Sequence, residues 1–233
     1  MLVRGSSTLG RSGYVISSEA EERRALANAR AREFFEELWS RGDPWELDSS
    51  ELDQSRYRRQ IELLEDRRYE RALELGCGAG AFTALLARIA DHVTAIDVAR
   101  AAVAAADRRG LDPSKVEVRA EDIMGFDPSR EGSFDLVVLA ETVYYLGWLY
   151  PMFDVAWLAA RVFQATSSGG RLLLVNSYGG DEDWLQRPWL LHTYRDLFAN
   201  VGYTLETEET ISGVKNGSVV TILMSRFRKD GGA

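Results

Sequence analysis

Apolar and polar positions alternate with two different periods along the chain, and the period changes near residue 70. Before that point apolar residues recur at helical spacing, which predicts helices over 18–40 and 51–65, separated by the helix-breaking pair Asp43-Pro44. After it, short apolar runs alternate with helix-like segments. The strands expected from these runs are 71–75, 92–97, 115–119, 134–140 and 171–176, and the expected helices are 80–90, 99–109, 150–165 and 193–200.

The order of these segments predicts the type of sheet. The run FDLVVLA over 134–140 is almost continuously apolar, which is typical of a central parallel strand buried on both faces. Strands that alternate with helices imply a parallel sheet with right-handed crossovers. The end of the chain differs, because strands are expected over 203–211 and 217–227 with only the turn-rich link SGVKNG between them. We therefore expect an α/β fold, a Rossmann-like three-layer α/β/α sandwich with a mostly parallel sheet, a C-terminal antiparallel hairpin and a helical N-terminal cap.

Length and composition limit the domain organisation and the partners. The 233 residues fit one decorated domain. It divides into a Gly/Ser-rich segment over 1–17 that is expected to be disordered, a helical cap over 18–66 and the α/β domain over 67–229. The net charge of −8 argues against binding to nucleic acid or to an anionic membrane. No apolar run approaches the roughly 20 residues that span a bilayer, and the first residues lack a secretory apolar region, so a cytoplasmic protein is expected.

The run ELGCGAG over 74–80 is the first candidate for chemistry, since it lies where a strand should meet a helix. Glycines there allow a sharp turn and a close approach of the backbone to a ligand, and the start of the helix offers free N–H groups. A relaxed form of the dinucleotide pattern G-x-G-x-x-G also fits, because Ala81 follows Gly80. The glycines alone therefore leave an NAD(P)-dependent Rossmann oxidoreductase as an alternative.

Two aspartates at later strand ends point to an adenosine ligand. Asp97 closes the strand after the glycine turn, where a carboxylate accepts the two ribose hydroxyls of such a ligand, and Asp122 follows the third strand, where it would accept the adenine amine. Each has a simpler interpretation, Asp97 as a cap for the helix over 99–109 and Asp122 as a solvated loop residue. The combination, with Glu74, the Glu121-Asp122 pair and the terminal hairpin, favours S-adenosylmethionine (SAM) over a dinucleotide.

The same segments resemble the motifs of class I SAM-dependent methyltransferases. The matching runs are ELGCGAG over 74–80, IDV over 96–98, AEDI over 120–123 and FDLVV over 134–138, and the resemblance covers roughly residues 70–227. A narrower resemblance lies in Asp43-Pro44-Trp45, Arg56-Tyr57 and AETVYYL over 140–146, which are similar to the NodS-like group. Members of that group N-methylate an amine of a chitooligosaccharide.

The resemblance implies the residues that bind SAM. They are Trp45, Tyr57, Glu74, Gly76, Cys77, Gly78, Gly80, Asp97, Val98, Glu121, Asp122, Ile123, Ala140 and Glu141. Glu74 would bind the methionine ammonium through water, and the glycine turn would pass beneath the methionine and ribose. Trp45 and Tyr57 would cover SAM from the N-terminal cap, and Ala140 and Glu141 would lie beside the methyl group. Cys77 stands at a variable motif position and receives no chemical role.

Aromatic residues crowd the segments after the fourth and fifth strands, which predicts an aromatic-walled pocket for the acceptor. They are Tyr144, Tyr145, Trp148, Tyr150, Phe153, Tyr178, Trp184, Trp189 and Tyr194. Most of them would pack a lid or core in the simpler interpretation.

The candidate catalytic residues are His192, Glu141 and Tyr145. A hydroxyl acceptor needs a general base, for which His192 is the natural choice, although His192 also fits a helix cap. Glu141 would accept the proton of an amine or hold a sugar hydroxyl. We expect methyl transfer to a small molecule with an amine, ahead of a hydroxyl, on a sugar-containing or natural-product scaffold. A SAM-binding partner subunit without catalysis is a further alternative, no metal is expected, and the sequence does not specify the oligomeric state.

Overall fold

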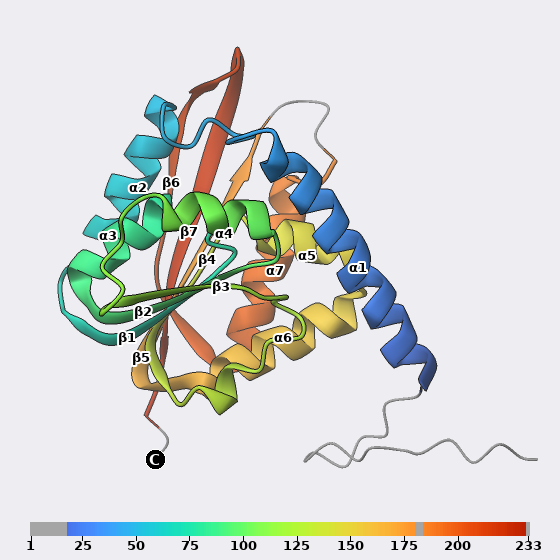
Figure 1. Cartoon of the computed structure of the whole chain (residues 1–233). Coiled ribbons are helices and arrows are strands. Elements are labelled where there is room, and N and C mark those ends of the chain that lie inside the picture. Colours follow the sequence, from blue (N-terminus) through green and yellow to red (C-terminus); the bar gives the residue numbers. More distant parts are fainter. Residues whose placement is uncertain (1–17, 180–183, 232–233) are drawn as a thin grey trace, which may run out of the picture.

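The computed structural model describes residues 18–179 and 184–231 (Figure 1). Within these ranges seven strands form one sheet in the order β3-β2-β1-β4-β5-β7-β6. The strands are β1 (Tyr69–Leu75), β2 (Ala90–Asp97), β3 (Val116–Ala120), β4 (Phe134–Ala140), β5 (Thr166–Tyr178), β6 (Tyr203–Lys215) and β7 (Ser218–Lys229). The first five strands are parallel to one another, whereas β7 is antiparallel to both of its neighbours, β5 and β6. The predicted sheet and its terminal hairpin are confirmed.

Helices cover both faces of the sheet, as the predicted three layers require (Figure 1). They are α1 (Ser18–Ser40), α2 (Glu51–Glu62), α3 (Ala81–Ile89), α4 (Arg100–Asp107), α5 (Val143–Leu149), α6 (Met152–Ala165) and α7 (Pro188–Asn200). Successive residues of the central strand β4 serve opposite layers, because Val137 packs in the core beside α5, α6 and α7, whereas Val138 packs in the core beside α2 and α3. This alternation explains why the β4 sequence is apolar throughout.

The N-terminal helices form at their predicted places. Ser50 caps α2, since its hydroxyl accepts the Asp53 N–H at 3.2 Å. The helix α2 contacts α3 and β6, while α1 contacts α4 and α5 across the end of the sheet. The disorder expected for 1–17 lies outside the described residues. None of the helices that the structure describes is long and apolar enough to cross a membrane.

Two predictions for the second half of the chain were wrong, since one helix was missed and another begins earlier than expected. The structure contains α5, which sequence patterning missed because this helix is only seven residues long and almost entirely apolar and aromatic, so it shows no amphipathic period. The helix α7 starts at Pro188 rather than at residue 193, because proline is well suited to the first helical turn.

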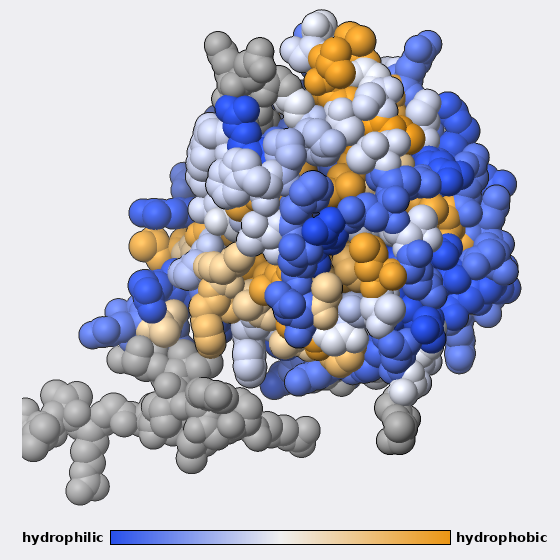
Figure 2. Space-filling view, turned by 180° about the vertical axis from the view of Figure 1, so that it is seen from behind, coloured by the Kyte–Doolittle hydropathy of each residue, from blue (hydrophilic) through white to orange (hydrophobic). Residues whose placement is uncertain are grey.

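The terminal hairpin is longer and tighter than predicted. The pairing of β6 with β7 continues to Lys215 and Ser218, so Asn216 and Gly217 alone make the turn, with φ values of 52° and 78°. Asn-Gly is the preferred pair for such a turn because both residues tolerate positive φ. Val214 and Val219 are exposed at this tip, which contributes the apolar surface at the top of Figure 2. The edge strand β6 otherwise carries Glu206, Glu208 and Glu209, and charges of this kind oppose pairing with another chain.

We expect Gly147→Ala in α5 to destabilise the protein, although alanine is the better helix former by about 1 kcal/mol. A Cβ at this position would overlap the Tyr194 hydroxyl and lie 2.9 Å from Cε1 of the same ring. Tyr194 is buried on α7, so its ring can make room only if its core neighbours shift. Overpacking of this kind costs about 1–3 kcal/mol, which urea unfolding would measure as a lower free energy of unfolding.

The control for this substitution is the Tyr194→Leu background, which lacks the ring. There Gly147→Ala should be neutral or stabilising. An equal loss of stability in both backgrounds would contradict the steric explanation.

Candidate active site

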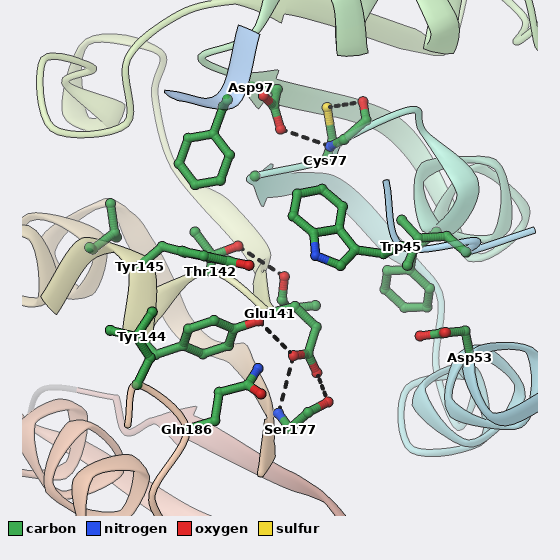
Figure 3. Close-up of a pocket in the computed structure, with 18 of the residues that line it drawn as sticks. Trp45, Asp53, Cys77, Asp97, Glu141, Thr142, Tyr144, Tyr145, Ser177 and Gln186 are labelled. Atoms are coloured by element: carbon green, nitrogen blue, oxygen red, sulfur yellow. Dashed lines mark hydrogen bonds between the residues drawn. The ribbon is translucent and has the colours of Figure 1, made fainter. Parts of the chain in front are cut away.

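A cavity of about 450 Å³ opens at the carboxyl ends of β1, β2 and β4, beneath the N-terminal helices. Its walls come from segments far apart in the chain, namely α1, α2, the β1–α3 turn, the ends of β2 and β4, α5 and the hairpin tip (Figure 3). Of the predicted SAM-binding residues, all but Gly80 and Glu121 line it. The structure therefore brings together the set that the resemblance implied, and the role of each residue stays a prediction.

The glycine turn forms the floor of one half of the cavity. Gly76 has φ 84°, and a Cβ there would overlap the Thr142 hydroxyl. Gly78 has φ 54°, and a Cβ there would lie 2.8 Å from the Trp39 ring. Only glycine fits both positions. Gly80, with φ 75°, caps the start of α3 instead of lining the cavity, so it shapes the turn from behind.

Asp97 braces this turn against the next helix. Its buried carboxylate accepts the N–H of Gly78 at 2.9 Å and the N–H of Ala99, just before α4, at 2.9 Å. Burial raises the pKa of Asp97, and these N–H bonds oppose the shift. The residue thus supports the start of α4, as the simpler interpretation expected, and also lines the cavity.

Asp122 presents an oxygen without a partner. Its Oδ1 accepts the Met124 N–H at 2.8 Å, whereas Oδ2 is buried and makes no hydrogen bond within the described residues. Burial raises the pKa of this carboxyl group. Arg161 fixes the loop from outside the cavity by donating to the carbonyls of Met124 at 2.9 Å and Phe126 at 2.8 Å. A fixed, unsatisfied acceptor in a cavity wall is suited to a ligand N–H.

Glu74 is the second polar group that lacks a counter-charge. It is buried on β1, and within the described part of the chain its carboxylate accepts a hydrogen bond from the Thr83 hydroxyl at 2.6 Å. Burial raises the pKa of Glu74 to about 8, the Thr83 hydrogen bond opposes this, and the nearby Asp97 adds to it. A cationic group bound here would stabilise the ionised carboxylate.

The opposite half of the cavity holds a network of paired charges that sequence reasoning missed. Glu141 forms an ion pair with Arg56 at 3.1 Å, Arg56 pairs with Asp53 at 2.8 Å, and Asp53 also pairs with Lys215 of β6. Arg56 is only 3% exposed. Burial acts to lower the pKa of Arg56, but the carboxylates of Glu141 and Asp53 outweigh it and raise the pKa, so the guanidinium stays charged. Arg56-Tyr57 was part of the sequence motif that resembles the NodS-like group. The residues near Arg56 in the sequence did not indicate that it would pair with Glu141.

Aromatic rings wall the space between the two halves. The centroid of the Tyr145 ring lies 5.1 Å from that of Phe35, 4.5 Å from that of Tyr144 and 6.3 Å from that of Trp45. All four residues line the cavity. Part of the predicted aromatic wall is thus present, with Phe35 added from α1. Four of the predicted members are exposed on the surface instead: Trp148 at 40%, Phe153 at 71%, Trp184 at 63% and Trp189 at 67%.

His192 and Glu121 lie away from the cavity, contrary to expectation. Because α7 already begins at Pro188, His192 is inside the helix, and the helical period turns Leu191 and Tyr194 to the core and His192 outward, where it is exposed. It is not among the described residues that line the cavity. Glu121 contributes its backbone N–H to the Asp97 carbonyl at 2.8 Å, and its side chain takes no part in the lining.

We expect the stability of the free protein to fall as the pH rises from 5 to 8. In this window native Glu74, with a pKa of about 8, keeps a proton that the unfolded chain, with an ordinary carboxyl pKa, has released. The unfolded state then binds fewer protons, so the free energy of unfolding decreases with pH by at most about 1.4 kcal/mol per unit from this group. Urea unfolding of wild type and Glu74→Gln at pH 5.5, 6.5 and 7.5 measures the difference.

Glu74→Gln should gain stability relative to wild type as the pH rises, since glutamine never ionises. Parallel pH profiles for the two proteins would show that Glu74 titrates normally in the fold.

Sequence comparison relates this chain to one protein family. The family model for nodulation protein S (NodS) matches residues 27–154. Nodulation protein S of Sinorhizobium fredii is 39% identical over 105 residues, which are 45% of this chain and 48% of the relative. The protein of that name from Rhizobium tropici is 34% identical over 132 residues, 56% of this chain and 53% of the relative. The chain thus spans about half the length of the curated relatives it matches.

Solved structures extend the similarity over more of the fold. The crystal structure of N-methyltransferase NodS from Bradyrhizobium japonicum WM9 in complex with S-adenosyl-L-homocysteine (SAH) has a TM-score of 0.73 and 28% identity, and the match covers 86% of this chain and 99% of that one. A structure concerned with the conversion of a disulfide bond into a thioacetal group during echinomycin biosynthesis has a TM-score of 0.61 at 22% identity and covers 87% of this chain and 94% of that one, which shows a shared fold alone.

The family model covers more than half of the chain, and it includes the glycine turn, Asp97, Asp122 and Glu141. The sequence resemblance to the NodS-like group is confirmed, and this chain belongs to the NodS family.

Proposed function

We propose that this protein is a SAM-dependent methyltransferase that methylates an amine of a small molecule. The proposal depends on two buried carboxylates that line the same cavity as the glycine turn: among the described residues Glu74 has no cationic partner, and Asp122 Oδ2 has no hydrogen-bond donor. Membership in the NodS family supports it, as does SAH bound to the NodS of Bradyrhizobium japonicum.

The residues present fit SAM in charge and in hydrogen bonding. Glu74 would face the amino group of the methionine moiety, Asp97 the ribose hydroxyls, and Asp122 Oδ2 the adenine amine. Val98 and Ile123 supply apolar lining beside those two aspartates. When bound, SAM supplies an electrophilic methyl group on a positively charged sulfur. The protein's own contribution is to align the acceptor and to exclude water with the aromatic wall.

The charge state of the cavity favours an amine over a hydroxyl as acceptor. No histidine lines the cavity in the described residues, and both carboxylates of the acceptor half, Asp53 and Glu141, are in ion pairs. Burial raises the pKa of Tyr57 to about 12, so its hydroxyl keeps its proton. An alcohol needs a base for its proton, whereas a neutral amine attacks with its own lone pair. A sugar-containing scaffold for this amine is the expectation that the resemblance supplied.

The two alternatives have less support. A dinucleotide has no protonated amino group that could donate hydrogen bonds to the buried Glu74, because the cationic ring nitrogen of its oxidised form carries no N–H. A partner subunit without catalysis has no need for the aromatic and charged half of the cavity next to the cofactor half.

We expect SAM and SAH to bind with micromolar dissociation constants and NAD not to bind, as measured by titration calorimetry. Binding at pH 7 should release a proton, because the ligand's cationic amino group lowers the pKa of Glu74 from about 8. Titrations in two buffers of different ionisation enthalpy would detect the proton. NAD binding without SAM binding would overturn the proposal.

Asp122→Ala should weaken SAH binding by about 1–3 kcal/mol, since it removes an acceptor that a buried ligand donor needs. The matched control is Asp112→Ala, which removes an exposed aspartate that only braces Ser114 outside the cavity. Equal affinity of the two variants for SAH would remove Asp122 from the cofactor site.

The acceptor class can be tested with glucosamine and glucose, which differ in one amine. With radiolabelled SAM, methyl incorporation into glucosamine and none into glucose is the expected result. Labelling of both sugars at similar rates would show a hydroxyl acceptor.

A further inference from the structure

Glu141 occupies an unusual backbone position at the end of β4. Its φ is 56°, in the left-handed region that residues other than glycine rarely adopt. Such a conformation persists only where surrounding contacts hold it. Here the side chain supplies those contacts, as Figure 3 shows for Tyr144 and Ser177.

The Glu141 carboxylate is surrounded by donors from three different walls of the cavity. Ser177 of β5 donates its hydroxyl at 2.6 Å and its N–H at 3.1 Å. The Tyr144 hydroxyl of α5 donates at 3.0 Å. Arg56 of α2 completes the set with an ion pair at 3.1 Å. Each carboxylate oxygen thus has two donors, so the lone pairs of Glu141 are engaged by the protein's own groups.

Arg56 is the link between this carboxylate and the N-terminal cap. Its guanidinium is almost completely buried and bridges Glu141 and Asp53, and Asp53 in turn pairs with Lys215 at the hairpin tip. Tyr57, the next residue of α2, lines the cavity and stacks on Phe82 of α3 with ring centroids 5.8 Å apart. Two cations and two anions thus balance in one network that joins α2, β4 and β6.

We propose that Glu141 is a positioning residue, which through Arg56 fastens α2 over the cavity and so sets the space left for the acceptor. It does not take the acceptor's proton, in contrast to the sequence-based hypothesis. The inference rests on the proposed function where it concerns an acceptor. The fastening of α2 can be tested without one.

The matched control is a second ion pair on the same helix. Arg59 of α2 pairs with Glu209 of β6 and, at 2.8 Å, with Glu62, on the outside of the molecule and away from the cavity. Arg59→Met removes a cation from α2 as Arg56→Met does, but leaves the buried network intact. Any effect that is specific to Arg56 therefore reports the network.

The experiment is hydrogen exchange of the α2 amides, 51–62, with and without SAH. We expect exchange in α2 to rise at least about tenfold in Glu141→Gln and in Arg56→Met, because each leaves the buried network with one charge that is not balanced. The double variant Arg56→Met/Glu141→Gln should recover most of the protection, since no charge is then stranded. Arg59→Met should exchange like wild type. SAH should still protect the glycine turn in every variant, since that segment does not contact Glu141.

Equal effects in Arg59→Met and Arg56→Met, or purely additive effects in the double variant, would overturn the inference. If wild type fails to bind SAH, the proposed function fails, while α2 exchange in the free proteins still decides whether Glu141 fastens the helix. If Glu141→Gln does not fold, Ser177→Ala with Tyr144→Phe removes two donors without changing charge, and α2 exchange should again rise.

Turnover of glucosamine separates positioning from proton transfer. A positioning role predicts that Glu141→Gln raises the KM for glucosamine by about tenfold or more, with kcat and its pH dependence close to those of wild type. Loss of kcat by about 10²–10⁴-fold, with loss of its pH dependence, would identify Glu141 as a general base instead.

Discussion

The candidate active site depends on one constraint. The strands β1 and β4 lie side by side and parallel, and the chain that follows each of them turns to opposite faces of the sheet. The turn after β1 leads to α3 on one face, and the turn after β4 leads to α5 on the other. Chain that departs in both directions leaves a crevice at the carboxyl ends of the two strands. Glu74 and Gly76 lie at the carboxyl end of β1, and Ala140 and Glu141 lie at the carboxyl end of β4. The opposite directions of the chain after these two strands therefore place the two halves of the site next to each other.

The two halves of the cavity differ in whether their buried carboxylates have partners within the protein. In the half formed by the ends of β1, β2 and β3, Glu74 has no cationic partner and Asp122 has an oxygen without a donor among the residues that the structure describes. Buried groups of this kind are destabilising unless a ligand satisfies them. In the other half, Asp53 and Glu141 are fully engaged with Arg56 and Lys215. The first half is therefore built to receive polar groups, and the second to hold its own walls in place.

The helix α2 of the N-terminal cap is held in position by its contacts with this second half of the cavity. The helix α2 has a low apolar content, and few of its side chains reach the core, so burial of apolar surface alone fixes it weakly. The buried Arg56 adds a contact whose geometry is specific, because an unpaired charge in that position would be strongly destabilising. The helix α2 thus meets β4 and β6 through the charges of Arg56 and Asp53, and α3 through the stacked rings of Tyr57 and Phe82.

The sequence by itself determined the order of strands and helices, the glycine turn and the two aspartates at strand ends, because each of these depends on neighbours within a few residues. Glycine at 76 and 78 and the continuous apolar run of β4 carry their information locally. Only the tertiary structure decided which polar side chains meet. Arg56, Glu141 and Lys215 are far apart in the chain and pair because the sheet brings α2, β4 and β6 together. It also turned His192 to the surface, since one extra turn at the start of α7 changes which side of the helix faces the core.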